Sequence, residues 1–365
     1  PALLLQRSRF TCTAGTGSLA ADSGVELSCR NQPVPDDQVK QNDEQLCYIR
    51  TGKPEFSAEG FTVELETKVT GLTAHYDTAF HTTGFEMDGP FSSEDGAGLR
   101  FSARIKAGDT FTIEKLTAIT TNRDHDPMLA PLPLNWSFDG LERENNKLWM
   151  EKWEIAGITI EGDVDAQTAI RYIIFQLIVN CSARDDTVSI GARGLTHTRY
   201  KGCYFWDTDL FMLPFYLYTD PGAARSLSKF RVNTLPQAKA HAKKMNGTGA
   251  RYPWMVALDG TEQCETWDIG CSEVHVTADV AYALGKYMEV AQDKDLFLNG
   301  GAEVLVETAR FWMGRYSPEP GTGLVNLLFC KGPDEYCGIT SNNLFTNVMV
   351  QHNLELAIRA AHALA

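Results

Sequence analysis

The sequence predicts an all-β N-terminal region followed by an all-α region. Three observations lead to this prediction. Short segments of alternating polarity extend from Arg9 to about Arg123, a proline-containing stretch follows, and helical spacing of apolar residues begins after it. At 365 residues the chain also exceeds the usual size of one compact domain. We therefore expect two folding units, each with its own hydrophobic core.

The first region has the residue pattern of short strands separated by turns. Segments such as GFTVELETKV, GLRFSARIKAG and DTFTIEKLTAIT alternate polar residues with Val, Leu, Phe and Ile. Gly, Asp, Ser and Pro separate these segments. Strands of this kind close into a sandwich in which one face of each sheet is buried. Residues 1–127 are therefore predicted to form a β-sandwich domain that supports the rest of the protein.

The pattern changes after DPMLAPLPL, residues 126–134, which places a domain boundary near residue 128. The segments LWMEKWEIAG and DAQTAIRYIIFQLIV then have helical spacing. In the helix that contains TADVAYA, the small residues Ala278, Ala281 and Ala283 allow close helix packing and have no chemical role. Helices are expected at about 165–180, 207–218, 222–246, 273–291, 301–316 and 343–365.

Composition and charge narrow the class of partner. With 43% hydrophobic and 22% charged residues, the chain is an ordinary soluble globular protein. A net charge of -14 disfavours nucleic acid and anionic membranes, so a neutral small molecule fits better. The sequence shows no apolar run of about 20 residues and no complete signal-peptide pattern at its start, and a cytoplasmic location is therefore expected.

Nine cysteines, an odd number without a CxxC pair, indicate reduced thiols. The pairs Cys264/Cys271 and Cys330/Cys337 share one spacing that a metal could use. No histidine lies beside them at zinc-finger spacing, so we expect neither a metal nor an organic cofactor.

Three stretches combine aromatic rings with carboxylates in predicted loops. They are FWDTD at 205–209, the region from YPW at 252–254 through EQCETWD at 262–268, and GPDEY at 332–336. A sugar presents C–H faces that stack on an indole and hydroxyl groups that need acceptors such as Asp or Glu. Trp206 beside Asp207 supplies both, which points to a carbohydrate site.

Each stretch, taken alone, also has a purely structural interpretation. In FWDTD, Asp207 or Thr208 caps a helix while Trp206 belongs to the core. In GPDEY, Asp334 bonds the local backbone of a turn and Glu335 is solvated. Both interpretations stay open when the residues are considered one stretch at a time.

Considered together and in order, the motifs resemble those of glycoside hydrolase family 65, which contains the α-glucoside phosphorylases. The motifs are YKGCYFWDTDLFMLPF, ARYPWMVALDG, SEVHVTADVAYAL, ETARFW and KGPDEYCGITSNNLFTNVM, and NRD at 122–124 is also similar. The match extends over about residues 149–365.

The resemblance implies a fold and a domain order. Residues 1–127 would be a β-sandwich that lacks its early strands, 128–164 a helical linker, and 165–365 the first part of an (α/α)6 catalytic barrel. A complete barrel has twelve helices, and this chain supplies about the first seven. The sequence is therefore expected to be a fragment that is inactive in isolation.

The same resemblance assigns the residues that hold and cleave the glucoside. Glu335 in GPDEY matches the general acid of the family. Trp206 and Asp207 match residues that hold the glucosyl ring, whereas Asp334 is expected to be structural. To stay protonated near neutral pH, the pKa of Glu335 must be raised by burial beside Tyr336 or by Asp334.

The resemblance also indicates further candidates in two neighbouring stretches. Trp254 of YPW matches a position near the site. The loop at 262–273 corresponds to a stretch that varies with the acceptor, and its candidate acceptor residues are Glu262, Glu265 and Trp267.

The implied reaction is inverting phosphorolysis of an α-glucosidic disaccharide, with inorganic phosphate as co-substrate and β-glucose 1-phosphate as product. The expected partners are a disaccharide and phosphate, without nucleic acid or membrane, and a homodimer is one assembly we allow for. An inverting hydrolase would instead need a second carboxylate about 6.5 to 9.5 Å from the acid. In the family, the phosphate loops and that base lie downstream of position 365. An inactive carbohydrate-binding or scaffold protein is the alternative from another class.

Overall fold

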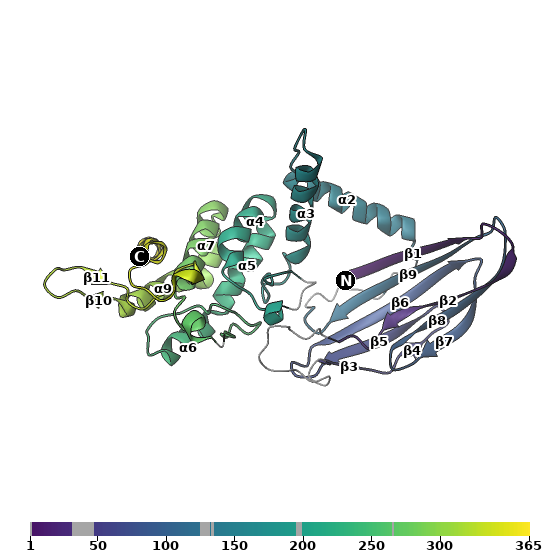
Figure 1. Ribbon diagram of the computed structural model, residues 1–365, viewed down its shortest axis with the longest axis horizontal. Coiled ribbons are helices and arrows are strands. Elements are labelled where there is room, and N and C mark those ends of the chain that lie inside the picture. The colour runs from purple at the N-terminus through teal and green to yellow at the C-terminus, as the bar shows by residue number, and fades with distance from the viewer. Residues whose placement is uncertain (1, 31–46, 125–131, 133–134, 195–198, 265) are drawn as a thin grey trace. The chain divides into compact units, whose positions relative to one another are not determined.

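The computed structural model describes residues 2–30, 47–124, 132, 135–194, 199–264 and 266–365 (Figure 1). The chain forms two compact units, Pro1–Glu151 and Lys152–Ala365. The predicted boundary near residue 128 lies outside the described residues. The predicted division into 1–127, 128–164 and 165–365 therefore stays a prediction.

The first unit consists mainly of antiparallel strands, as the alternating pattern predicts. One sheet has the order β1-β9-β6-β5-β3, with β4 also paired to β5, and a second sheet has the order β2-β8-β7. The strands are β1 (Ala2–Thr11), β2 (Thr16–Glu26), β3 (Ile49–Thr51), β4 (Glu55–Phe56), β5 (Gly60–Thr67), β6 (Thr73–Thr83), β7 (Glu86–Ser92), β8 (Gly96–Lys106) and β9 (Thr110–Thr121).

Both sheets contribute side chains to one hydrophobic cluster. Phe61 and Phe80 come from the first sheet, and Leu99 and Phe101 come from β8 in the second. The rings of Phe80 and Phe101 lie 5.4 Å apart between centroids. Because side chains alternate along a strand, Arg100 between two core residues of β8 is exposed. From Leu99 to Arg104, burial therefore follows the period-2 pattern of the sequence.

The second unit is helical, apart from a short hairpin of β10 (Ser317–Pro318) and β11 (Val325–Asn326). Helix α2 (Phe138–Ala156) spans the division between the units. The remaining helices are α3 (Val164–Asn180), η1 (Arg199–Gly202), η2 (Thr208–Met212), α4 (Leu213–Thr219), α5 (Pro221–Asn233), α6 (Leu235–Lys244), η3 (Trp267–Cys271), α7 (Val276–Ala291), α8 (Lys294–Leu296), η4 (Phe297–Gly301), α9 (Ala302–Arg315), η5 (Glu335–Cys337) and α10 (Leu344–Leu364).

The helices expected from periodicity are present, but the single helix predicted at 222–246 is wrong. The segment forms two helices, α5 and α6, which meet at Thr234. Pro236 lies in the first turn of α6. Proline lacks a backbone N–H, and its ring clashes with the carbonyl four residues earlier, so a continuous helix through this point is excluded.

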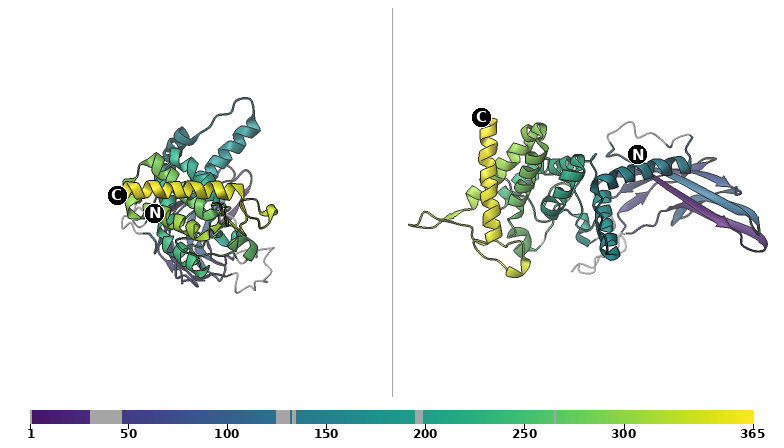
Figure 2. Two further views of the ribbon diagram at one scale, coloured as in Figure 1. Left: turned by 90° about the vertical axis from the view of Figure 1, so that its left-hand side faces the viewer. Right: turned by 90° about the horizontal axis from the view of Figure 1, so that it is seen from above.

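Helix α7 lies at the centre of the helical core and packs against α4, α5, α9 and α10. Ala278 and Ala281 have no exposed surface, which confirms the predicted packing role of the alanines. A Cβ on Gly285 would lie 2.7 Å from the side chain of Leu356 in α10. Figure 2 shows α10 as a long, straight helix that ends the chain. The small residues of α7 therefore allow the close approach of α10.

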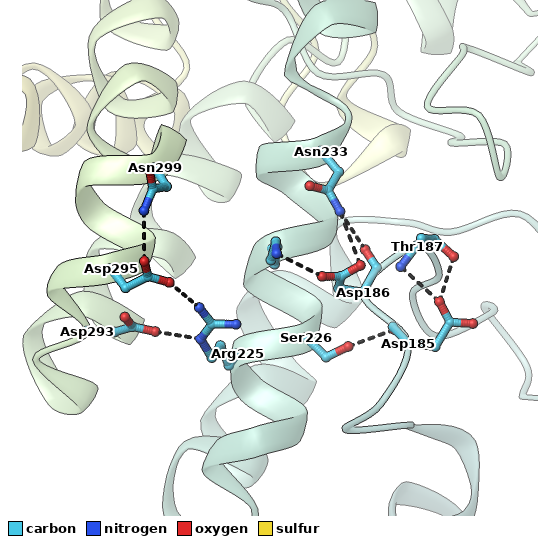
Figure 3. Close-up of polar contacts among 10 residues, drawn as sticks. Asp185, Asp186, Thr187, Arg225, Ser226, Asn233, Asp293, Asp295 and Asn299 are labelled. Carbon is cyan, nitrogen blue, oxygen red and sulfur yellow. Dashed lines mark hydrogen bonds and ion pairs between the residues drawn. The ribbon is translucent and has the colours of Figure 1, made fainter. Parts of the chain in front are cut away.

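Polar contacts fix the outer face of α5 (Figure 3). The Arg225 guanidinium donates to Asp293 at 2.9 Å and to Asp295 at 2.7 Å. Farther along α5, Asn233 donates to the carbonyl of Asp186 at 3.0 Å. These bonds hold α5 between the loop at 185–187 and the turn that begins α8.

No helix within the described ranges is both long enough and apolar enough to cross a membrane.

Candidate active site

Three segments that are distant in the sequence meet around the start of α7. They are 205–209, which contains FWDTD, the loop at 262–275, and the loop at 330–340, which contains GPDEY. Ring contacts join the first segment to the second, and a backbone hydrogen bond joins the second to the third. The structure therefore brings together the three stretches that the sequence singles out.

Trp206 forms a half-buried aromatic wall. Its ring lies edge-on to the imidazole of His275, with 4.9 Å between centroids. Phe211 and Phe345 lie beside it, with centroids at 5.3 and 6.2 Å. An indole held on its edges in this way keeps a fixed orientation, which stacking on a sugar requires.

The two aspartates of FWDTD have different environments. Asp209 is buried and forms an ion pair with Arg231 of α5, which anchors the segment to the helical core. Asp207 is exposed and makes no side-chain capping bond, although it precedes η2. The predicted alternative, in which the Asp207 side chain caps a helix, is therefore wrong. Desolvation, assisted by the charge of Asp209, raises the pKa of Asp207.

Glu262 organises the loop that the sequence assigns to the acceptor sugar. Its carboxylate accepts backbone N–H bonds from Trp254 at 2.7 Å, Met255 at 3.0 Å and Cys264 at 2.9 Å. Three N–H donors use most of the acceptor capacity of one carboxylate. The structure thus gives Glu262 a positioning role for the loop, whereas a direct contact with sugar stays a prediction.

Other acceptor-loop candidates are placed less tightly. Trp254 packs edge-on against Phe205, with 4.9 Å between ring centroids, and its buried Nε1 has no hydrogen-bond partner among the described residues. Trp267 begins η3 with a side chain that is 67% exposed. Glu265 lies outside the described residues. Trp267 is therefore accessible to a ligand in solution, and Trp254 offers an unused donor.

The loop that carries Glu335 is tied at its base. Cys330 and Thr340 exchange two backbone hydrogen bonds of 2.8 Å, and Lys331 N–H donates to the carbonyl of Ser272 at 2.9 Å. Gly332 lies so close to Asn343 that an added Cβ would be 2.4 Å from its side-chain nitrogen. These contacts at the base of the loop therefore fix the position of its tip.

Asp334 caps the short helix η5 at the tip of this loop. Its carboxylate accepts the N–H of Tyr336 at 3.0 Å, which confirms the predicted bond to the local backbone. A carboxylate engaged in this way fixes the turn from which Glu335 projects.

Glu335 itself is exposed, and the expectation that Tyr336 buries it is wrong. The Tyr336 side chain is fully exposed and therefore shields nothing from solvent. The pKa of Glu335 is nevertheless raised, first by partial desolvation and then by the charges of Glu273, Asp268 and Asp334. The opposite charge of Lys331 partly offsets this effect. The direction of the shift suits a proton donor.

The sequence pattern did not indicate the buried charged residues near this loop. Glu273, His275 and Asp279 are 2%, 0% and 0% exposed. The His275 Nδ1 lies 2.6 Å from Asp279, and its Nε2 lies 3.8 Å from Glu273. Asp279 belongs to the TADVAYA stretch that was assigned to packing alone. The i, i+4 spacing of His275 and Asp279 on a helix is the signal that would have revealed the pair.

Lys331 is a second residue that sequence reasoning missed. The side chain is 5% exposed, and its ammonium lies 3.4 Å from the exposed carboxylate of Asp268. Both positions lie in stretches that the sequence singled out, EQCETWD and KGPDEY, but neither residue was among the predicted site residues. The pair joins the Glu335 loop to η3 and sets part of the charge around Glu335.

No cluster of three or more His, Cys, Asp or Glu side chains suited to a metal occurs in the described part of the chain. All nine cysteines are free thiols. The site therefore offers an indole wall, exposed carboxyl groups at Asp207 and Glu335, and buried charges behind them. Such a set can bind a sugar ring and transfer a proton to a leaving oxygen.

Comparison with known proteins also relates the chain to enzymes that act on carbohydrates. Residues 171–365 match the Glycosyl hydrolase family 65 central catalytic domain. An alpha,alpha-trehalose phosphorylase from Thermoanaerobacter brockii is 37% identical over 280 residues, which cover 74% of this chain and 36% of the relative. A kojibiose phosphorylase from Caldanaerobacter subterraneus subsp. tengcongensis is 39% identical over 267 residues, 67% of this chain and 34% of the relative.

The fold also has a solved counterpart. A putative kojibiose phosphorylase from the human microbiome superposes with a TM-score of 0.85 at 24% identity, covering 98% of this chain and 47% of that structure. The superposition shows that the two chains share a fold. The present chain spans about a third of the length of the curated relatives named above.

Proposed function

Because the chain belongs to glycosyl hydrolase family 65, we propose that the protein of which it is part is a phosphorylase of α-glucosidic disaccharides. Inorganic phosphate is the co-substrate, and the products are β-glucose 1-phosphate and an acceptor sugar. The reaction inverts the anomeric configuration, with Glu335 as the proton donor. Phosphate is already anionic at neutral pH and attacks without a catalytic base.

The observation that carries this proposal is the convergence of the three loops at the start of α7. Trp206 touches His275, His275 lies beside Glu273, and Glu273 is the neighbouring charge that acts most strongly on Glu335. A stacking surface and a carboxyl group with a raised pKa are thus linked through two buried residues. General acid catalysis by such a group contributes about 10² to 10⁴-fold to the rate.

Each candidate residue has a role in the proposed site. Trp206 and Asp207 hold the glucosyl ring, by stacking and by accepting hydroxyl hydrogens. Trp254 and Trp267 line the acceptor side, and Glu262 keeps Trp254 in place through its backbone N–H. The proposal also includes Glu265 on the acceptor side.

The finer architecture belongs to the same proposal. The two sheets of the first unit are assigned to a β-sandwich, the following helices to a linker, and the second unit to an (α/α)6 barrel that this chain fills in part. A cytoplasmic location and a homodimer complete the proposal. A solved structure of the full-length protein with twelve barrel helices would support the barrel assignment, and a different helix arrangement would overturn it.

The test is an assay of the full-length protein with kojibiose, nigerose, maltose and trehalose, each with and without phosphate. Phosphate-dependent release of glucose 1-phosphate from one of them is the expected result. Release of free glucose without phosphate would show hydrolysis instead. No turnover of any α-glucoside, together with retained sugar binding, would show an inactive carbohydrate-binding protein.

A further inference from the structure

A small cavity lies beside the ion pair that anchors FWDTD to the helical core. Its volume is about 10 Å³, and residues of η2, α4, α5 and α7 line it. All nine lining residues are buried. One water molecule needs about 10–15 Å³ of such space. The cavity therefore has room for a single water molecule, and it is too small for a sugar or a phosphate ion.

Arg231 supplies an unused hydrogen-bond donor to this cavity. Its Nε donates to Oδ1 of Asp209 at 3.0 Å, and its Nη2 forms the ion pair with Oδ2. Its Nη1 has no hydrogen-bond partner among the described residues, and the side chain is 3% exposed. A guanidinium carries five N–H donors, and a donor left unpaired in a protein interior destabilises the fold. The Nη1 of Arg231 therefore needs an acceptor.

Ser228 Oγ is the second unsatisfied polar atom at the cavity. A hydroxyl within a helix can donate to the carbonyl four residues earlier, as Thr308 in α9 does to Val304 at 2.8 Å. Ser228 Oγ makes no hydrogen bond to any described residue, although Ser228 is only 4% exposed. Ser228 and Arg231 are three residues apart on α5, so their side chains lie on the same face of the helix. The two unsatisfied groups therefore belong to one site.

The charges around the cavity favour a neutral ligand. Arg231 and Asp209 are the charged residues in its described lining, and they neutralise each other. An added ion would leave a net charge in an interior that solvent screens poorly. Each oxygen of Asp209 accepts one bond from Arg231, and a carboxylate has about four acceptor positions. Asp209 can therefore accept a further hydrogen bond, which a water molecule can donate.

We infer that this cavity is the binding site of one internal water molecule. The water accepts a hydrogen bond from Nη1 of Arg231, bonds to Ser228 Oγ and donates to the carboxylate of Asp209. Three partners are the usual number for a buried water. The water thereby completes the connection of α5 to the segment at 205–209, which carries Trp206 and Asp207. This role is independent of the proposed reaction.

The test is a set of crystal structures of the full-length protein and two variants, at a resolution that shows ordered water. In the wild type, one peak of electron density is expected within about 3.2 Å of both Ser228 Oγ and Arg231 Nη1. Ser228→Val replaces the hydroxyl with methyl groups that fill the cavity, so the peak should be lost. The control is Ser226→Ala in the same helix, which removes a hydroxyl that donates to the Asp185 carbonyl at 2.7 Å. Its structure should retain the peak.

Three results would overturn the inference. They are a wild-type cavity without density, an anomalous peak in the cavity after a bromide soak, which would assign the site to an anion, and an unchanged peak in Ser228→Val. If Ser228→Val does not fold, as judged by its melting transition, the wild-type maps with and without bromide decide. A full-length protein that is inactive on every α-glucoside would overturn the proposed function and leave this test unchanged.

Discussion

The imidazole of His275 and the carboxylate of Asp279 form a fully buried pair, with 2.6 Å between Nδ1 and Oδ2. Burial lowers the pKa of His275, but the bond to Asp279 and the nearby Glu273 outweigh it and raise the pKa to about 9. Burial raises the pKa of Asp279 to about 6, against the opposing effect of His275. Both groups are therefore charged at pH 7.

His275 is expected to make stability depend on pH on the alkaline side. A raised folded-state pKa stabilises the fold below the unfolded value of 6.5, and this stabilisation is lost as pH rises through about 9. The loss is on the order of 3 kcal/mol. The melting temperature of the wild type should fall between pH 6.5 and 9, and His275→Gln should abolish this component. Equal slopes for the two proteins would contradict the charged state of His275.

His241 is expected to make the stability of the fold depend on pH in the acid range. Burial, assisted by the charge of Arg251, lowers its pKa to about 4, so the folded state keeps the imidazole neutral. Stability from this residue is present above pH 6.5 and is lost as pH falls through about 4. Thermal unfolding between pH 4 and 6.5 should therefore show a smaller acid loss in His241→Gln than in the wild type. An unchanged acid loss would show that His241 is not the responsible group.

The sequence predicted the fold class well, for a physical reason. Period-2 alternation reports burial of one strand face directly, as the buried Phe101 beside the exposed Arg100 shows, and helical spacing did the same for α7. It failed at Thr234, where the apolar pattern continues through a break that Pro236 makes. Periodicity measures which face is buried, and it is insensitive to a missing backbone donor.

The site was predictable in part. The aromatic and acidic composition of the loops pointed to a carbohydrate site at Trp206 and Asp207, the resemblance to the family assigned Glu335, and Asp334 bonds the backbone as expected. Glu273 and Lys331 were missed, because their importance depends on a tertiary contact between loops about 60 residues apart. The local sequence of neither loop predicts that contact.

Glu262 is expected to stabilise the acceptor loop. Glu262→Gln places an amide donor opposite three backbone N–H groups, so at least one of them loses its acceptor. Each buried donor left unpaired costs about 1–3 kcal/mol. The expected result is a lower melting temperature together with a higher KM for the acceptor in the synthetic direction.

The exposed neighbour Gln263 provides the matched control for this change. Gln263→Ala should leave both the melting temperature and KM near their wild-type values. A Glu262→Gln variant as stable as Gln263→Ala would contradict the anchoring role.

The two aspartates that bind Arg225 are expected to differ in their contribution to stability. Asp293 is 15% exposed, accepts Arg225 at 2.9 Å and Tyr287 at 2.7 Å, and caps α8. Asp295 is 68% exposed and pairs with the same guanidinium. Asp293→Ala should cost about 2–3 kcal/mol, since it removes a cap and two hydrogen bonds. Asp295→Ala should cost less than about 1 kcal/mol, because solvent screens the pair.

Denaturant unfolding of the two variants measures this difference. High salt should reduce the contribution of Asp295 more than that of Asp293. Equal losses for the two substitutions would show that the cap and the Tyr287 bond contribute nothing measurable.

The measurement that tests the account most directly is phosphorolysis by Glu335→Gln in the full-length protein. The substitution preserves volume and removes the transferable proton, so phosphate-dependent turnover should fall by about 10²-fold or more while the melting temperature is retained. Glu319→Gln, at an exposed glutamate in the β10–β11 hairpin, should be as active as the wild type. Full activity in Glu335→Gln would contradict the assignment of Glu335 as the proton donor.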